Sequence, residues 1–285
     1  MAEATPKTHA LLERYSSATL AKLRKESVVY TLFNHRYEGT PTAGAVKIPV
    51  RDTEVEVIKD YDRKTGTGLT YSDTTLMTLP IDQELVVNEL VDGYEAAAVP
   101  DRLVADRLDS AGYVLADTLD MDCASLLATK GTAYSNTTAM TKNTIYETIV
   151  DMKKQLKKAK VRANMLWLLV SPDVTALFEK SPEFIKASQL GDTVTTAGFA
   201  GRVSGMPVYE TLNLPEGVEM IMGNSEFAHL VDEWKVPVSV NDLKDGKHVG
   251  ASAIQGRRIY GRTISRPNTI LVKKIATQQD GTPKS

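Results

Sequence analysis

The stretch PDRLVADRLDSAGYVLADTLDMDCASLLATKG, residues 100–131, contains the strongest structural signal of the chain. Apolar side chains recur in it at steps of three and four residues, the spacing of one face of an α-helix. They are Val104, Leu108, Ala111, Leu115, Leu119, Cys123 and Leu126. Pro100 suits a first helical position, and Lys130 with Gly131 forms a C-terminal stop. We expect one helix of about 29 residues, roughly 43 Å long at 1.5 Å per residue, which acts as a beam.

A polar two-stranded ribbon is expected before this helix, between Ala45 and Leu79. Val46, Ile48 and Val50 alternate with polar residues, and DRKTGTGLTY, residues 62–71, supplies glycines for a turn. An isolated two-stranded ribbon is only marginally stable in water, so this one is predicted to lie on a partner surface. The candidate interface residues near its tip are Glu54, Glu56, Asp60, Asp62, Arg63 and Lys64.

Helices and strands alternate after a polar loop that ends near residue 143, which predicts an α/β unit from Thr144 to about Gly250. Thr144 and Glu147 form a capping-box pattern for its first helix. MLWLLV, residues 165–170, is expected to be a buried strand, and Ser171 to start the next helix. We expect strands in RVSGMPVYETLNLP, residues 202–215, and GVEMIMGN, residues 217–224, and a helix in SEFAHLVDEW, residues 225–234.

Two further segments stand at the ends of the chain. Residues 8–25 carry a weak helical pattern, typical of an arm that packs on something else. AIQGRRIYGRTISRPNTILVKKI, residues 253–275, predicts two strands interrupted near Arg266 and Pro267.

The second of these segments holds the main basic cluster, which consists of Arg257, Arg258, Arg262 and Arg266. Alternation along a strand places Arg258, Tyr260 and Arg262 on one face. The cluster could touch DNA phosphate, but an intersubunit salt bridge or a solvated face is favoured, because the protein as a whole is near neutral.

The totals describe an ordinary globular protein. The 285 residues are 42% hydrophobic and 25% charged, with a net charge of −2 and a pI near 6.1. This near-neutral net charge argues against a protein whose main surface binds nucleic acid, since such proteins normally carry an excess of basic residues. The single cysteine, Cys123, excludes an intramolecular disulfide framework and favours a reducing, intracellular setting. No run of 18 apolar residues and no secretion signal is present.

The sequence contains few residue patterns that are typical of catalytic or cofactor-binding sites. It contains no G-x-S-x-G, Walker or G-x-G-x-x-G motif, and we predict no cofactor and no enzymatic activity. Asp120 and Asp122 stand two residues apart, so they do not face each other as an acid–base pair on a helix. One metal-like group is His229, Asp232 and Glu233, which would share a face of the expected helix. It motivates a metal-assisted hydrolase as the alternative from another class.

The order of these segments resembles the major capsid proteins of tailed double-stranded DNA bacteriophages with the Hong Kong 97 fold, an α+β architecture. The stretches that carry the resemblance are VKIPV (46–50), TLMTLPIDQELVVNELVD (75–92), RLDSAGYVLADTLDMDCASLLA (107–128), LWLLVSPDVTALFEKSPEFIKASQ (166–189) and GRVSGMPVYETLNLP (201–215). The resemblance implies an N-terminal arm over residues 1–44, an extension loop (a β-hairpin) over 45–79 and a peripheral domain with a spine helix over 80–143. It also implies an axial domain over 144–250, peripheral return strands over 251–275 and a C-terminal tail over 276–285.

The same resemblance implies a function in assembly. Such subunits form hexamers and pentamers that close into an icosahedral shell around DNA, within a virion assembled in the bacterial cytoplasm. The partners implied are further copies of the chain, neighbouring capsomers, a separate scaffolding protein, a portal and packaged DNA, with no membrane. An encapsulin-like cargo shell is the nearest alternative. Some relatives crosslink a ribbon lysine, and Lys59 and Lys64 lie in the ribbon, but no acceptor is identified and no crosslink is predicted.

Overall fold

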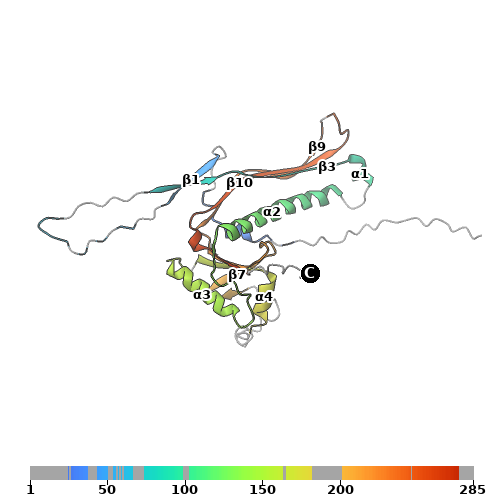
Figure 1. The fold of residues 1–285 in the computed structure, drawn as a ribbon. Helices are drawn as coiled ribbons and strands as arrows, with labels where there is room; N and C mark the ends of the chain where they lie inside the picture. Colours follow the sequence, from blue (N-terminus) through green and yellow to red (C-terminus); the bar gives the residue numbers. More distant parts are fainter. Residues whose placement is uncertain are drawn as a thin grey trace, which may run out of the picture.

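The computed structural model describes residues 25, 27–37, 44–50, 54, 55, 57, 59, 61–66, 74–98, 103–162, 165–181, 201–244 and 246–275. Figure 1 shows a body with a flat upper part, a rounded lower part and a ribbon that projects sideways. The expected arm helix over 8–25, the helix start at Pro100 and the tail lie outside the described residues, apart from Lys25.

The long helix and a three-stranded antiparallel sheet form the upper part. Helix α2 runs from Leu103 to Lys130, and the strands are β3 (Gln83–Val91), β9 (Ala228–Asp242) and β10 (Ser252–Ile264). The strand order is β3-β10-β9, and the helix lies along one face of this sheet (Figure 1). Apolar side chains from both elements, among them Ala111 and Ile254, form the core between them. The predicted beam helix is confirmed, including its end at Lys130.

Gly131 ends this helix because a side chain would not fit there. A Cβ on Gly131 would lie 2.6 Å from the carbonyl oxygen of Leu127 and 2.7 Å from Val272. Such distances are well inside van der Waals contact, so the chain passes close against strand β11 (Leu271–Lys274) at this point. The stop read from the sequence therefore also has a packing cause.

A six-stranded mixed sheet forms the lower part. Its order is β4-β11-β8-β5-β7-β6. The strands are β4 (Thr132–Ala133), β11 (Leu271–Lys274), β8 (Val218–Asn224), β5 (Leu166–Val170), β7 (Met206–Glu210) and β6 (Arg202–Val203). Helices α3 (Ile145–Lys158) and α4 (Pro172–Glu179) pack against it. Every residue of β5 is buried, as its unbroken apolar run predicts.

The described residues also form a two-stranded ribbon and three short elements. Strands β1 (Ala45–Val50) and β2 (Thr75–Pro80) pair antiparallel, with Ala45 opposite Pro80. The short elements are η1 (Val29–Leu32), α1 (Gly93–Ala98) and η4 (Pro267–Thr269). In the described part of the chain, no helix combines the length and apolar character needed to cross a bilayer.

The helix expected over residues 225–234 is wrong, because the chain forms β9 there. Ala228, His229, Leu230 and Val231 are all buried, so neither helical nor strand periodicity shows in the sequence. Pairing with β10 decides the conformation, a case in which tertiary packing overrides local preference. Pro237 is tolerated because β9 is an edge strand and its register with β10 shifts beside this residue.

The expected capping box is also not formed. Thr144 precedes α3, but its side chain caps no helical N–H group. Instead its hydroxyl accepts a hydrogen bond of 3.0 Å from the backbone N–H of Thr141. The preceding turn therefore competes successfully for the capping side chain.

The predicted pair of strands interrupted near Arg266 and Pro267 is confirmed. The sequence does not show that the two strands belong to different sheets. Strand β10 belongs to the three-stranded sheet, whereas β11, after η4, belongs to the six-stranded one. The chain thus crosses between the two parts of the body within a few residues.

A buried ion pair fixes the loop that leads into α3. Lys273 is fully buried, and its Nζ lies 3.5 Å from Glu219 Oε2 and donates to the Thr138 carbonyl. Glu219 Oε1 accepts from the Met140 N–H at 3.3 Å. Strands β8 and β11 therefore both bind the loop between β4 and α3.

Replacing Lys273 by methionine is expected to lower the free energy of unfolding by about 3 to 5 kcal/mol, because Glu219 would remain buried without its cation. Chemical denaturation measures the change. Lys274→Met is the matched control, since Lys274 is the exposed neighbour on the same strand, and it should change the value by less than about 0.5 kcal/mol. Equal losses in both variants would show that the ion pair has no special role.

Candidate intersubunit surfaces

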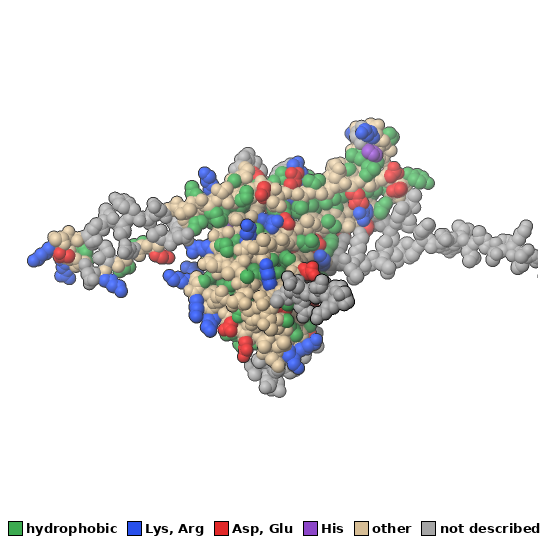
Figure 2. Space-filling model, viewed as in Figure 1, with side chains coloured by type: hydrophobic (Ala, Val, Ile, Leu, Met, Phe, Trp, Pro, Cys, Tyr) green, Lys and Arg blue, Asp and Glu red, His purple; other side chains and the backbone are tan. Residues whose placement is uncertain are grey.

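The ribbon carries the first group of predicted site residues. Glu54, Asp62, Arg63 and Lys64 are exposed, whereas Glu56 and Asp60 lie outside the described residues. Figure 2 shows acidic and basic side chains at the far end of the ribbon, away from the body. The structure therefore presents charges of both signs where the sequence predicts an interface.

Asp62 organises the turn at this end. Its carboxylate accepts hydrogen bonds from the Thr65 hydroxyl at 2.6 Å and from the Lys64 N–H at 2.8 Å. These bonds, the Thr65 one foremost, lower the pKa of Asp62 below its usual value. Gly66, with φ 67°, closes the turn in the left-handed region. Asp62 is thus both a surface charge and the residue that shapes the tip.

Apolar side chains are also exposed near the tip. Val55 is 86% exposed, Val57 is 79% exposed and Tyr61 is 60% exposed. In the sequence, Val55 and Val57 alternate with polar residues, a pattern that by itself indicates a strand and not an exposed apolar surface. Exposed apolar residues beside charges are typical of a surface that another protein covers.

The base of the ribbon is held by close packing against the body. Ile48, Leu79 and Val231 form a buried cluster that joins the ribbon to β9. Gly261 of β10 lies so close that an added Cβ would be 2.3 Å from the Pro80 carbonyl oxygen. The direction in which the ribbon leaves the body is therefore fixed by β9 and β10.

The four arginines of the basic cluster each contact a partner within the chain. Arg257 pairs with Glu84, and Arg266 lies 5.8 Å from the centre of the Phe227 ring. Arg258 donates to Asp232 at 2.7 Å and lies 5.1 Å from the centre of the Tyr30 ring. The side chains of Arg258 and Arg262 are only 12% and 15% exposed.

Two carboxylates on α2 bring distant segments together. Arg262 pairs with Asp122 at 2.9 Å, and the Tyr260 hydroxyl donates to the same carboxylate. Burial, followed by this bond, raises the pKa of Tyr260. Asp120 is fully buried and accepts at 2.9 Å from both the Tyr30 N–H and the Asn213 side chain. The two acids therefore anchor packing, a role that sequence reasoning missed.

Cys123 lies beside these acids and is fully buried, as its place on the apolar stripe predicts. Burial raises the pKa of its thiol to about 12. A thiol in that state is not a nucleophile near neutral pH.

The three residues of the predicted metal-like group are not arranged to bind one metal ion. His229, Asp232 and Glu233 stand on a strand, where residues three apart point to opposite sides. His229 Nε2 lies 3.0 Å from the Ser265 hydroxyl, and Asp232 is paired with Arg258. Across the described ranges, no three such side chains are grouped to hold a metal ion.

Comparisons with known proteins agree with this architecture. A family model described as phage capsid protein matches residues 93–272. A structure from Mycobacterium phage Che8 is 23% identical, with a TM-score of 0.77 over 92% of this chain and 96% of its own. The capsid of cyanophage P-SCSP1u is 13% identical, with a TM-score of 0.74 over 93% of each chain. The capsid of a native GTA particle is 14% identical, with a TM-score of 0.66 over 94% of this chain and 96% of its own. No curated protein matches in sequence.

The burial of His229 predicts a pH dependence. Burial lowers its pKa to about 4, from an ordinary value of 6.5. Between these two values the unfolded chain binds the proton and the folded chain does not, so stability falls as the pH falls from about 6.5 toward 4. His229→Gln should reduce that fall, whereas His248→Gln, at an exposed position, should leave it unchanged. Thermal unfolding between pH 7 and pH 4 measures both, and equal slopes in all three proteins would contradict the assignment.

Proposed function

The chain belongs to the phage capsid protein family, and we propose that its copies assemble as hexamers and pentamers into an icosahedral shell around double-stranded DNA. It is a structural shell protein with the Hong Kong 97 fold, located in the virion capsid. The encapsulin-like cargo shell and the metal-assisted hydrolase gain no support from these matches.

The observation that carries the proposal is the projecting ribbon. Its described tip exposes Val55, Val57 and Tyr61 together with charges, and the ribbon points away from its own body (Figure 1). A surface of this kind gains stability only when another molecule covers it. A second copy of the chain supplies that cover in every capsomer, which explains why one chain builds such an element.

The ribbon charges are proposed to pair with a neighbouring subunit. Glu54, Glu56, Asp60, Asp62, Arg63 and Lys64 mix both signs, so the neighbour must present a complementary strip. The arginines at positions 257, 258, 262 and 266 are a weaker proposal as an interface or DNA-facing surface, because each has a partner in its own chain.

The domain division implied by the resemblance is likewise a proposal. Two separate sheets support a peripheral and an axial part. The pairing of β9 with β10 favours ending the axial part before Ala228, earlier than residue 250. We further propose that the chain assembles in the bacterial cytoplasm with a separate scaffolding protein and a portal as partners. We also propose that it catalyses no reaction.

Electron microscopy of the purified chain, alone and with a candidate scaffolding protein, tests the assembly. Closed particles or capsomer rings are expected, with light scattering confirming their mass. A uniform monomer or dimer of about 31 or 62 kDa under both conditions, one or two times the 31.2 kDa chain mass, would contradict it.

Reversing the ribbon charges tests the interface. The variant Glu54→Lys, Arg63→Glu and Lys64→Glu, which keeps the turn-forming Asp62, should stop shell formation while leaving the subunit folded, because repulsion replaces attraction at every copy of the contact. Exchanging the exposed pair Asp151 and Lys154, whose charged atoms are 3.6 Å apart, is the matched control and should leave assembly intact. Sedimentation and circular dichroism report assembly and folding. Shells formed by the reversed variant as efficiently as by the parent would refute the interface.

A further inference from the structure

A lysine-lined groove lies between α3 and the turn that joins β6 to β7. It encloses about 490 Å³ and is lined by Val150, Lys153, Lys154, Lys157, Lys158 and Ser204. No acidic residue occurs among these six, nor anywhere in the sequence from residue 152 to residue 172. The protein as a whole has a net charge of −2, so this groove concentrates positive charge against the overall balance.

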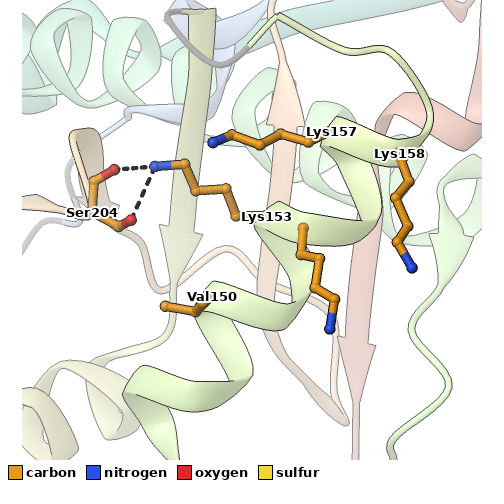
Figure 3. A pocket seen from close by; sticks show the side chains of 6 residues that line it. Val150, Lys153, Lys157, Lys158 and Ser204 are labelled. Carbon is orange, nitrogen blue, oxygen red and sulfur yellow. Dashed lines mark hydrogen bonds between the residues drawn. The ribbon is translucent and has the colours of Figure 1, made fainter.

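Two of the four lysines, Lys153 and Lys157, point toward one wall of the groove. Figure 3 shows Lys153 and Lys157 both directed toward Ser204, whereas Lys158 points away from it. The Lys153 ammonium donates to the Ser204 hydroxyl at 2.9 Å and also to its carbonyl oxygen. Ser204 has φ 51°, an unusual value for a residue with a side chain, and it directs both oxygens toward the ammonium. Lys153 is thus held in place by neutral oxygens.

The groove has little anionic compensation of its own. Lys154 lies 3.6 Å from Asp151, but within the described part of the chain Lys153, Lys157 and Lys158 have no carboxylate within ion-pair distance. Burial and then the charge of Lys157 lower the pKa of Lys153. Lysines four apart on a helix repel each other, and α3 contains two such pairs, 153 with 157 and 154 with 158.

The helix dipole explains only part of this arrangement. It favours cations in the last turn, where Lys157 and Lys158 lie, and its effect fades beyond that turn. Lys153 lies before the last turn and points to Ser204, away from the terminal carbonyls of the helix. A ligand that brings negative charge would relieve the repulsion between Lys153 and Lys157.

We propose that this groove binds phosphate groups, carried either by a nucleic-acid backbone or by a free oligophosphate. Ammonium groups on flexible stems suit phosphate oxygens, which offer acceptors in several directions. The open shape admits a strand that continues past the site, and the volume exceeds that of one phosphate. Phosphate binding here does not require shell assembly, because all six lining residues belong to a single subunit.

Binding of the full-length protein to a labelled 20-base-pair duplex and to tripolyphosphate tests the proposal. Lys153→Gln with Lys157→Gln should weaken binding roughly 10- to 100-fold near 0.1 M salt and lower the salt slope of duplex binding by about 2, because two counterion-releasing contacts are lost. Lys130→Gln with Lys142→Gln removes the same charge from exposed sites, including the last turn of α2, and should have a much smaller effect.

The possible results separate the sources. Loss of both ligands supports a site for phosphate from either source, and loss of the duplex alone supports the nucleic-acid backbone. Equal weakening by both double variants, or a selective loss of binding to an oligoglutamate peptide instead, overturns the proposal. If the double variant fails to fold, Lys157→Gln alone should lower the slope by about 1. Electron microscopy of the same samples reports shell formation separately, so a failed groove and a failed shell remain distinguishable.

Discussion

Two carboxylates on one turn of the long helix hold the described structure together. A buried carboxylate is stable only when donors surround it, so the segments that supply those donors must meet at that turn. Asp120 accepts hydrogen bonds from Tyr30 and Asn213. Asp122 accepts a hydrogen bond from Tyr260 and forms an ion pair with Arg262. The segment before the ribbon, the loop after β7 and the middle of β10 are thereby joined to α2. Strand β10 continues through η4 to β11, so the strand that binds Asp122 also leads into the six-stranded sheet.

The direction of the ribbon follows from this junction. Gly261 lies between Tyr260 and Arg262, the two residues of β10 that bind Asp122, and the ribbon base packs closely against it. Moving β10 relative to α2 would therefore turn the ribbon as well. The proposed contact of the ribbon with a neighbouring subunit needs a defined exit angle, and a charged, hydrogen-bonded contact is more directional than apolar packing. The polar junction within the subunit and the exposed contacts of the ribbon are thus mechanically linked.

Local patterns in the sequence were sufficient for the elements whose packing is local. The periodicity of residues 104–126 predicts α2, and the unbroken apolar run of 166–170 predicts β5, because one face or the whole element is buried. The failures have a different origin. Residues 228–231 are buried on both sides and show no period, so only pairing with β10 identifies β9. The partners of Arg258 and Arg262 stand 26 and 140 residues away, so the cluster could only be interpreted as an outward-facing patch.

The charges of this protein therefore fall into two groups with different physical roles. Buried pairs such as Lys273 with Glu219 cost desolvation but define one geometry, which suits a subunit that is repeated many times in a shell. Exposed charges at the ribbon tip are individually weak, about 0 to 1 kcal/mol per pair. Weak contacts can break and re-form while a shell grows, and a misplaced subunit can leave before others enclose it. A shell repeats each contact many times, so a small free energy per pair suffices once all of them are made. Rigid geometry inside the subunit and reversible contacts outside it are the combination that closed assembly requires.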